Sequence, residues 1–282
     1  MKFNLMIPNP IAGCFVINLP HRTDRWKLFQ EQLPLLQTLG ITPERMDAVY
    51  GRKLPGFGEK PWFTKRLSEK RANAWGGKAG CTLSHRNAIA LAKERGWKNV
   101  LIVEDDVSFD ATIAGQWANL VDTMAKLPDD WIAIYLYGHH PIPPVRVVYT
   151  YPETTCYELC GAYSTTAYIL NSKYFDDLLH LMPRDKDVWA WTARHKTVDR
   201  WFSCQLCLLG RVYAWSPFGI VHLETPSDAT TSGEAYEAPS FRFKSMKKDS
   251  FFGLKRGVKC MRDQASLRLS LIRFGIKRLC GL

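Results

Sequence analysis

A short apolar run that ends in three acidic residues places the firmest limit on the fold of this chain. The run is Asn99-Val-Leu-Ile-Val103, and Glu104, Asp105 and Asp106 follow it directly. Its length and β-branched content favour a buried strand over a helix. Acids at the carboxyl end of such a strand are typical of ligand sites in open α/β sheets. The pattern therefore predicts an α/β protein with a site at this edge of the sheet.

Further strands and helices alternate along the chain. An apolar run at 14–19 predicts the first strand, and a polar loop at 20–25 leads into a helix. The remaining expected elements are strands at 131–137, 162–170, 212–215 and 219–221, helices at 81–95 and 174–181, a long functional loop at 51–80 and a Pro-rich loop at 141–144. The alternation predicts a mainly parallel central sheet.

The three acids are candidates for metal binding. Strand alternation would place Glu104 and Asp106 on one side of the sheet, facing solvent, and Asp105 on the other. Two carboxylates on one side suit a hard divalent cation such as Mn²⁺ or Mg²⁺. His222, at the end of the last expected strand, could add a metal ligand or a phosphate contact. A solvated acidic turn and a structural histidine are the alternatives.

Polar residues beside the first strand and in the next helical segment could bind a phosphate-bearing ligand. Arg22 and Arg25 bracket the loop after the first strand and could hold phosphates or a base, and Asn18 ends that strand. Ser84 and His85 could position a phosphate or sugar, or hold the chain by hydrogen bonds. Two solvated arginines at a helix start are the alternative. No Gly-x-Ser-x-Gly turn is present, which disfavours a hydrolase.

Asp199 is the candidate general base. It begins an apolar helix in the segment Thr197-Val-Asp-Arg-Trp-Phe202. A carboxylate at such a position could take the proton from an attacking hydroxyl group. The alternative is a charge that complements the helix dipole.

The net charge of +11 is concentrated at one end. Residues 241–282 hold twelve Lys or Arg against two Asp, a net +10, which leaves residues 1–240 almost neutral. A near-neutral body disfavours nucleic-acid binding. Basic and apolar residues interleave in the tail and favour an anionic membrane surface, with a disordered tail or a packed helix as alternatives. We expect a domain at 1–240 and a tail at 241–282.

The cellular location and the state of the cysteines are predicted from the lack of an export signal or membrane-spanning pattern in the sequence. No apolar stretch reaches the length of a membrane span, and the first ten residues make a poor signal peptide, so a cytoplasmic protein is expected. Without export, disulfides are disfavoured. The pairs Cys156/Cys160 and Cys204/Cys207 could be read as a zinc site, but buried free thiols are favoured.

Four stretches, in this order, resemble glycosyltransferase family 25, the lipooligosaccharide galactosyltransferase family that includes the collagen galactosyltransferase domains. The stretches are Val16-Ile-Asn-Leu-Pro-His-Arg-Thr-Asp-Arg25, Gly80-Cys-Thr-Leu-Ser-His85, Val100-Leu-Ile-Val-Glu-Asp-Asp-Val107 and Gly161-Ala-Tyr-Ser-Thr-Thr-Ala-Tyr-Ile-Leu170. Val198-Asp199 also fits. The segment 56–79 and the basic tail lie outside the shared pattern.

The resemblance implies a GT-A-like fold, a nucleotide-sugar donor, usually UDP-galactose, and transfer with inversion. The expected enzyme moves a hexose to a lipopolysaccharide or lipooligosaccharide acceptor at the inner face of a membrane. The resemblance also implies a Mn²⁺-type metal at Glu104-Asp105-Asp106, and it supports Asp106 as a metal ligand and Asp199 as base. Together with the candidates from the residues themselves, we expect Glu104, Asp106 and His222 to bind Mn²⁺ or Mg²⁺. We expect Asn18, Arg22, Arg25, Ser84, His85, Glu104 and Asp105 to bind the donor. The alternative is an inactive family member that acts as a glycan- or nucleotide-binding scaffold.

Overall fold

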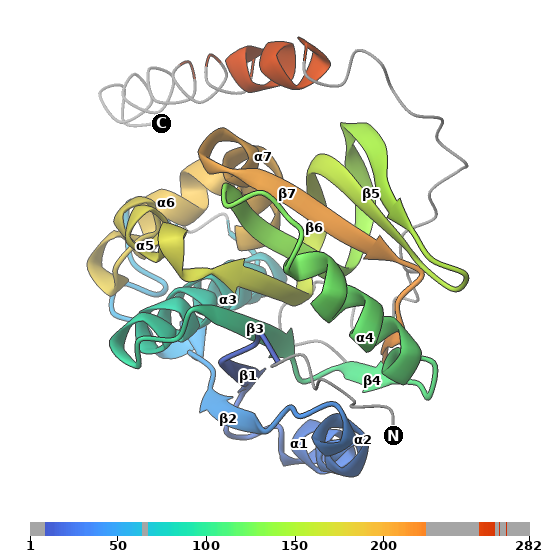
Figure 1. Cartoon of the computed structure of the whole chain (residues 1–282). Coiled ribbons are helices and arrows are strands. Elements are labelled where there is room, and N and C mark those ends of the chain that lie inside the picture. The colour runs from blue at the N-terminus through green and yellow to red at the C-terminus, as the bar shows by residue number, and fades with distance from the viewer. Residues whose placement is uncertain (1–8, 64–66, 224–253, 263–264, 266–268, 270–282) are drawn as a thin grey trace, which may run out of the picture.

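One central sheet of six strands organises the computed structural model, which describes residues 9–63, 67–223, 254–262, 265 and 269. The strands follow the order β2-β1-β3-β6-β5-β7 (Figure 1). They are β1 (Gly13–Asn18), β2 (Pro43–Asp47), β3 (Asn99–Glu104), β5 (Trp131–Thr150), β6 (Thr155–Asn171) and β7 (Arg211–Ser216).

Five of these strands run in one direction. β1 pairs in parallel with β2 and β3, and β7 pairs in parallel with β5. β6 is antiparallel to β3, β5 and β7. The expectation of an α/β protein with a mainly parallel central sheet is confirmed.

A second, two-stranded sheet lies beside the acidic residues. β4 (Val107–Phe109) pairs antiparallel with β8 (Ile220–His222), and Val107 is the register partner of His222. The backbone N–H of Leu223 also donates to the carbonyl of Asp106 at 2.7 Å. This pairing brings the end of the last strand back to the carboxyl end of β3.

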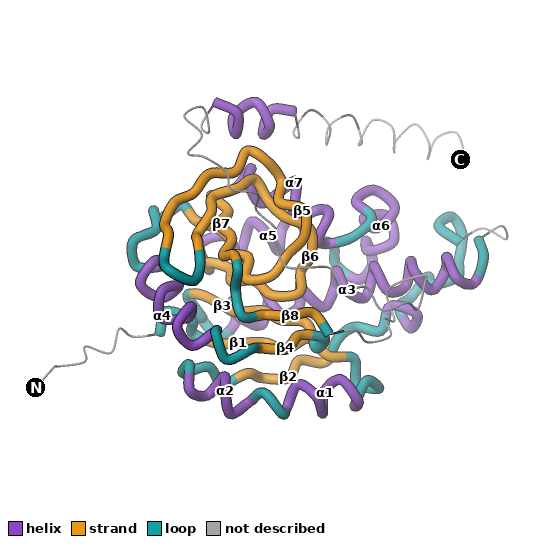
Figure 2. The backbone as a smooth tube through the Cα atoms, turned by 90° about the vertical axis from the view of Figure 1, so that its right-hand side faces the viewer, coloured by secondary structure: helices purple, strands orange, loops and turns teal. Residues whose placement is uncertain are grey.

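Helices cover both faces of the sheet because alternate strand residues point to opposite sides. Phe15 and Ile17 of β1 pack with α3, α5 and α7, whereas Cys14 and Val16 pack with α1, α2 and α4. The helices are α1 (Thr23–Gln30), α2 (Leu33–Thr38), α3 (Glu69–Glu94), α4 (Ile113–Met124), α5 (Phe175–Leu181), α6 (Val188–His195) and α7 (Val198–Leu209), with 3-10 turns at Gly51–Lys53, Ser172–Tyr174 and Asp185–Asp187. Figure 2 shows α1 and α2 beside the edge strand β2.

The expected loop at 51–80 is wrong beyond Ser68, because α3 begins at Glu69. Residues 80–85, which the sequence places at the start of a helix, therefore lie in the middle of α3. Its glycines serve close packing: a Cβ added to Gly80 would lie 2.3 Å from the carbonyl of Val49, and one added to Gly51 would lie 1.8 Å from that of Gly76. Tertiary contact thus outweighs the poor helix propensity of glycine here.

The remainder of that segment is packed. Phe57 and Phe63 make ring contacts with Trp189 of α6, and the indole N–H of Trp189 donates to the carbonyl of Pro55 at 2.7 Å. The Pro-rich loop expected at 141–144 is also wrong, since β5 continues through it with register shifts.

The described part of the tail is helical at 254–262. Arg256 Nη2 donates to the carbonyls of Cys207 and Gly210, at 3.2 and 3.0 Å, and so caps the C-terminal end of α7. The expected boundary at 240/241 lies outside the described residues. None of the helices in the described ranges combines the length and apolarity that a bilayer span requires.

Candidate functional site

A pocket opens at the carboxyl ends of β1 and β3, beside the middle of α3. Its empty volume, including space open to solvent, is about 740 Å³. Its walls include Arg25 of α1, residues 48–52, and Gly77, Cys81, Ser84 and His85 of α3. Glu104, Asp105 and Asp106 complete the lining. The acidic residues therefore border a pocket at the sheet edge that the sequence pattern indicates.

Arg25 binds two of the three acids. Its Nη1 donates to Asp105 Oδ1 at 2.8 Å and to Asp106 Oδ2 at 3.1 Å. Burial raises the pKa of Asp105, although the Arg25 charge opposes this shift. Because β3 ends at Glu104, strand alternation does not extend to the next two residues. The expectation that Asp105 points to the opposite side is therefore wrong: both aspartates turn toward Arg25.

Asp106 also lies beside His222, the residue that β8 brings back to this edge. Their Oδ2 and Nε2 atoms are 3.4 Å apart. Burial raises the pKa of Asp106, but the hydrogen bond and charge of His222, with the charge of Arg25, bring it below its usual value. The same hydrogen bond raises the pKa of His222. The side chain of Asp106 is buried, so the expectation that it faces solvent is wrong.

One oxygen of Asp106 suits a metal ion. Its Oδ1 is buried and has no hydrogen-bond partner among the described residues. A buried carboxylate oxygen without a partner is costly unless a cation or water satisfies it. With the His222 imidazole adjacent, this donor set fits a divalent cation such as Mn²⁺.

Glu104 has different partners. Its Oε1 accepts from Thr165 Oγ1 at 2.8 Å and lies 3.1 Å from His85 Nε2. The other ring nitrogen of His85 is 2.8 Å from the hydroxyl of Tyr168. The three carboxylates thus meet two sets of side chains, with Glu104 on the α3 side and the aspartates on the α1 side.

The other candidates for donor binding differ in their surroundings. Asn18 is fully buried, donates to Asp105 Oδ2 at 2.5 Å and accepts from Arg45 Nε at 2.9 Å. Ser84 Oγ donates to the carbonyl of Gly80 and accepts from the backbone N–H of Val49. These bonds make Asn18 and Ser84 parts of the scaffold that shapes the pocket.

Arg22 points to a neighbour in its own loop. Its guanidinium binds the largely exposed carboxylate of Asp24 at 2.8 Å, and Arg22 is not among the described residues that line the pocket. Its bond to Asp24 contributes to a pKa of about 2 for that carboxyl group. A donor would have to extend beyond the pocket to reach Arg22.

Asp199 lies in the first turn of α7 and is half-buried. Its Oδ1 accepts from the backbone N–H of Arg200 at 2.7 Å. Burial raises the pKa of the Cys81 thiol well above its usual value, and the charges of Glu104, Asp199 and Asp106 raise it further. Asp199 therefore lies close enough to Cys81 for its charge to act on that thiol, but it is not among the described residues that line the pocket.

α7, the helix that carries Asp199, packs closely on β6. Gly161 of β6 has a φ of +151°, and a Cβ there would lie 2.7 Å from the carbonyl of Ser203. Only glycine permits both this backbone conformation and this approach.

Sequence reasoning missed Cys81 and Thr165 as members of the site. The spacing of four between Cys81 and His85 could have indicated that both share one helix face. No sequence pattern could have indicated Thr165. The residue before it, Ser164, has a φ of +90°, so the regular alternation of side chains along β6 is interrupted there.

Comparisons with known proteins agree with the sequence pattern. Residues 11–139 match the family model described as glycosyltransferase family 25 (LPS biosynthesis protein). Procollagen galactosyltransferase 1 of Danio rerio is 25% identical over 183 residues, which cover 61% of this chain and 29% of the relative. A probable inactive glycosyltransferase 25 family member 3 of Bos taurus is 30% identical over 174 residues, or 56% of this chain and 27% of the relative.

The chain thus spans less than a third of the length of these relatives. Among solved structures, a glycosyltransferase involved in the glycosylation of the major capsid of PBCV-1 aligns with a TM-score of 0.33 and 11% identity, over 64% of this chain and 65% of that one.

Proposed function

Since residues 11–139 match the model of glycosyltransferase family 25, we propose that this chain is an inverting glycosyltransferase that moves galactose from UDP-galactose to an acceptor of the lipopolysaccharide or lipooligosaccharide type. The observation that carries the proposal is the buried, unpartnered Oδ1 of Asp106 in the lining of a pocket with two further carboxylates. The family match supports the reaction class, and the similarity to procollagen galactosyltransferases supports galactose as the sugar.

The pocket lining accounts for donor binding in this proposal. Residues 48–52 and the α3 wall surround the nucleotide, and Arg25, His85, Glu104 and Asp105 contribute charged and polar edges. Asn18 and Ser84 act through the residues that they hold, Asp105 and the backbone of Val49.

Asp106 and His222 would hold Mn²⁺ or Mg²⁺, whereas Glu104 binds Thr165 and His85 on the α3 side of the pocket. When bound there, the metal would stabilise the negative charge that develops on the departing diphosphate. Arg25 Nη1 lies 3.1 Å from Asp106 Oδ2 and favours the ionised carboxylate, whereas His222 must give up any proton on the ligating nitrogen to bind the metal. The negative charge of Asp106 is the condition for recruiting a cation to the pocket.

Asp199 serves as general base. Its carboxylate accepts the proton of the acceptor hydroxyl as that oxygen attacks the anomeric carbon, opposite the leaving diphosphate. Attack from that face inverts the configuration. The close contact between Gly161 and the backbone of Ser203 holds α7, the helix that carries this carboxylate, against β6.

The alternative is an inactive family member, because two of the similar proteins are named as inactive or probably inactive glycosyltransferases. A screen of UDP-sugars with the full chain separates the two. We expect UDP release from UDP-galactose with Mn²⁺ and none with EDTA or with Asp106→Ala, while Asp129→Ala, at an exposed acid outside the pocket, retains it. Release by Asp106→Ala in EDTA contradicts the metal role. UDP-galactose binding without UDP release supports the scaffold.

We also propose that the tail places the protein on an anionic membrane, at the inner face where a lipid-linked acceptor would lie. The described helical residues Leu254, Val258 and Met261 are 69%, 53% and 65% exposed. Their spacings of four and three within the helical segment 254–262 put them on one helix face. This set of three residues is called the apolar stripe below.

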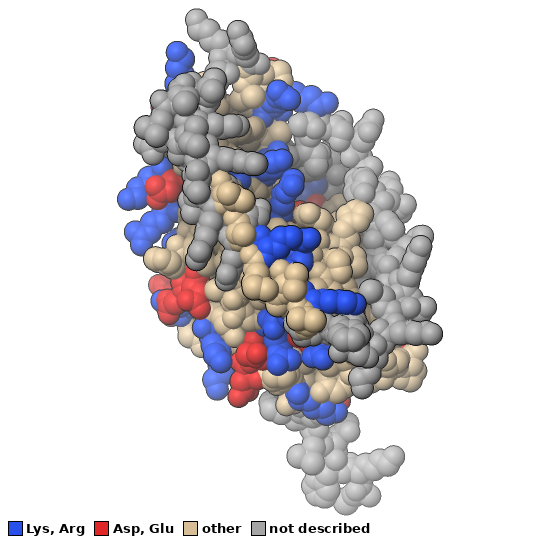
Figure 3. All heavy atoms as spheres, turned by 90° about the horizontal axis from the view of Figure 1, so that it is seen from above, with Lys and Arg blue, Asp and Glu red and all other residues tan. Residues whose placement is uncertain are grey.

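Basic residues flank the apolar stripe. Lys255 and Arg262 are exposed on the same helical segment, while Arg256 and Cys260 on its other side contact α7. Figure 3 shows Lys and Arg side chains across the middle of this face of the molecule. Such a helix, apolar outward and basic at its border, suits a surface of anionic headgroups.

A further inference from the structure

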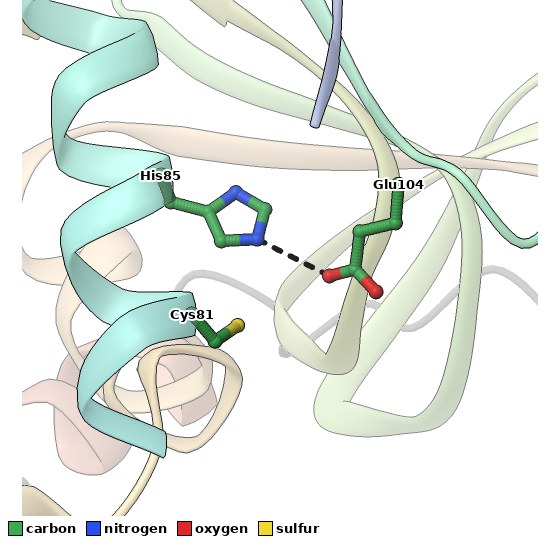
Figure 4. A group of neighbouring side chains, drawn as sticks. All are labelled: Cys81, His85 and Glu104. Atoms are coloured by element: carbon green, nitrogen blue, oxygen red, sulfur yellow. Dashed lines mark hydrogen bonds and ion pairs between the residues drawn. The ribbon is translucent and has the colours of Figure 1, made fainter. Parts of the chain in front are cut away.

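Cys81, His85 and Glu104 form a cluster that the proposed reaction does not use as a unit. Cys81 and His85 are four residues apart on α3, so their side chains share one helix face. Glu104 ends β3 directly opposite them (Figure 4). One potential ligand atom from each residue lies within 4.8 Å of the others, and His85 Nε2 is 3.1 Å from Glu104 Oε1.

The surroundings hold two of the three side chains in place. The Tyr168 hydroxyl is 2.8 Å from His85 Nδ1, and it can accept the Nδ1 proton and leave Nε2 free to ligate. Thr165 donates to Glu104 Oε1 at 2.8 Å and so orients the carboxylate. Tyr168 is itself buried, which fixes the imidazole plane. Outer partners of this kind are typical of metal centres.

We propose that Cys81, His85 and Glu104 form a binding site for Zn²⁺, distinct from the hard-cation position at Asp106. A thiolate, an imidazole and a carboxylate are a ligand set that Zn²⁺ accepts and that Mg²⁺ and Mn²⁺ do not favour. Tetrahedral Zn²⁺ separates its ligand atoms by about 3.3–3.6 Å. The cluster, with its atoms already within 4.8 Å, needs only side-chain adjustment to reach that geometry.

The fourth position of such a site would open to the pocket. Cys81, His85 and Glu104 all belong to its lining, so an exogenous oxygen ligand can complete a tetrahedron. On binding, the thiol gives its proton to solvent and its sulfur forms the bond to the metal, so no oxidant or reductant is needed. In the metal-free protein, burial, and then the charges of the neighbouring carboxylates, raise the pKa of that thiol well above its usual value.

Cobalt reports directly on the sulfur ligand. The full chain is titrated with Co²⁺ alone, and we expect a thiolate-to-cobalt charge-transfer band together with the visible bands of four-coordinate Co²⁺. Cys81→Ser should remove the charge-transfer band, whereas Cys204→Ser, at a half-buried thiol on α7, should keep it. Absence of the band in the unaltered chain, or its persistence in Cys81→Ser, overturns the site.

Zinc affinity tests the two other ligands and the orienting hydroxyl. By calorimetry, His85→Ala should weaken Zn²⁺ binding by more than about tenfold, and Tyr168→Phe by about 10- to 100-fold, with unfolding temperature as the folding control. Alkylation of Cys81 in the unaltered chain needs no variant: Zn²⁺ should protect it, as mass spectrometry of the peptide would report. Equal alkylation with and without Zn²⁺ overturns the site even if the variants do not fold. None of these measurements depends on sugar transfer.

Discussion

Arg25 Nη1 lies 2.8 Å from Asp105 Oδ1, and both side chains are less than a tenth exposed. The same nitrogen also reaches Asp106. Two adjacent buried carboxylates repel each other, so this guanidinium is the charge that permits them to lie at one sheet edge. It links α1 to the end of β3, and both segments contribute to the lining of the pocket.

Arg25→Gln should therefore destabilise the fold. Removing one partner of a buried ion pair costs about 3–5 kcal/mol, because the remaining charge is left buried. Lys93→Gln is the control, since Lys93 pairs with the largely exposed Asp176 and such pairs contribute only about 0–1 kcal/mol. Urea unfolding measures both free energies. A loss no greater than that of the control would show that Arg25 is dispensable for the acidic wall.

Asp199→Asn tests the general base. The amide keeps the size of the carboxylate but cannot take the proton, so we expect turnover to fall by about 10²–10⁴-fold with UDP-galactose affinity almost unchanged. Asp176→Asn, in the first turn of α5, is the matched control and should retain full turnover. Acceptor-dependent UDP release and calorimetry supply the two readouts.

A drop of less than about tenfold for Asp199→Asn would place the base elsewhere. Glu158 is not an alternative, because it is buried and bound to Arg146 and so is not available for proton transfer. Glu224 lies outside the described residues and becomes the next variant to measure.

Gly80→Ala tests the contact between α3 and the pocket wall at 49–51. The new methyl group would meet the Val49 carbonyl at 2.3 Å and the Gly51 nitrogen at 2.8 Å, so backbone must shift. We expect a loss of about 1–3 kcal/mol in stability, with weaker UDP binding because the wall moves. Gly115→Ala in α4, with 3.5 Å to the nearest atom, should instead stabilise by up to about 1 kcal/mol. Equal thermal unfolding of the two variants would contradict this packing.

The sequence predicts the local elements well where burial and periodicity act together. β1 and β3 lie within a residue or two of their expected limits, because each is a short apolar run covered on both faces. α3 was expected to begin near residue 81 because glycines before it disfavour a helix. Gly76 and Gly80 contact residues 49–51, which are distant in the sequence. This contact therefore leaves no periodic pattern around the glycines.

The candidate site likewise combines features that the local sequence predicts with features that depend on distant contacts. The acidic triplet marks the correct edge of the sheet, but β3 ends at Glu104 and the pattern beyond it follows a turn. The contact of Asp106 with His222 depends on the pairing of two three-residue strands, β4 and β8, which are more than a hundred residues apart. Strands this short carry too few residues for a pattern to specify their partner.

The apolar stripe gives the final prediction, which concerns membrane binding. Removal of residues 241–282 would also strip Arg256 and Cys260 from α7, so point variants on the stripe are the cleaner test. Val258→Glu combined with Met261→Glu replaces two exposed apolar side chains with anions next to Lys255 and Arg262. With about 1 kcal/mol lost per side chain, partitioning onto phosphatidylglycerol-containing vesicles should fall about thirtyfold.

Leu181→Glu, at an exposed apolar residue of α5, is the matched control and should bind as the unaltered chain does. Binding should also weaken with added salt, because screening reduces the attraction between Lys or Arg and the headgroups. Equal vesicle sedimentation of the double variant and the control, at low salt, would rule out the stripe as the membrane contact.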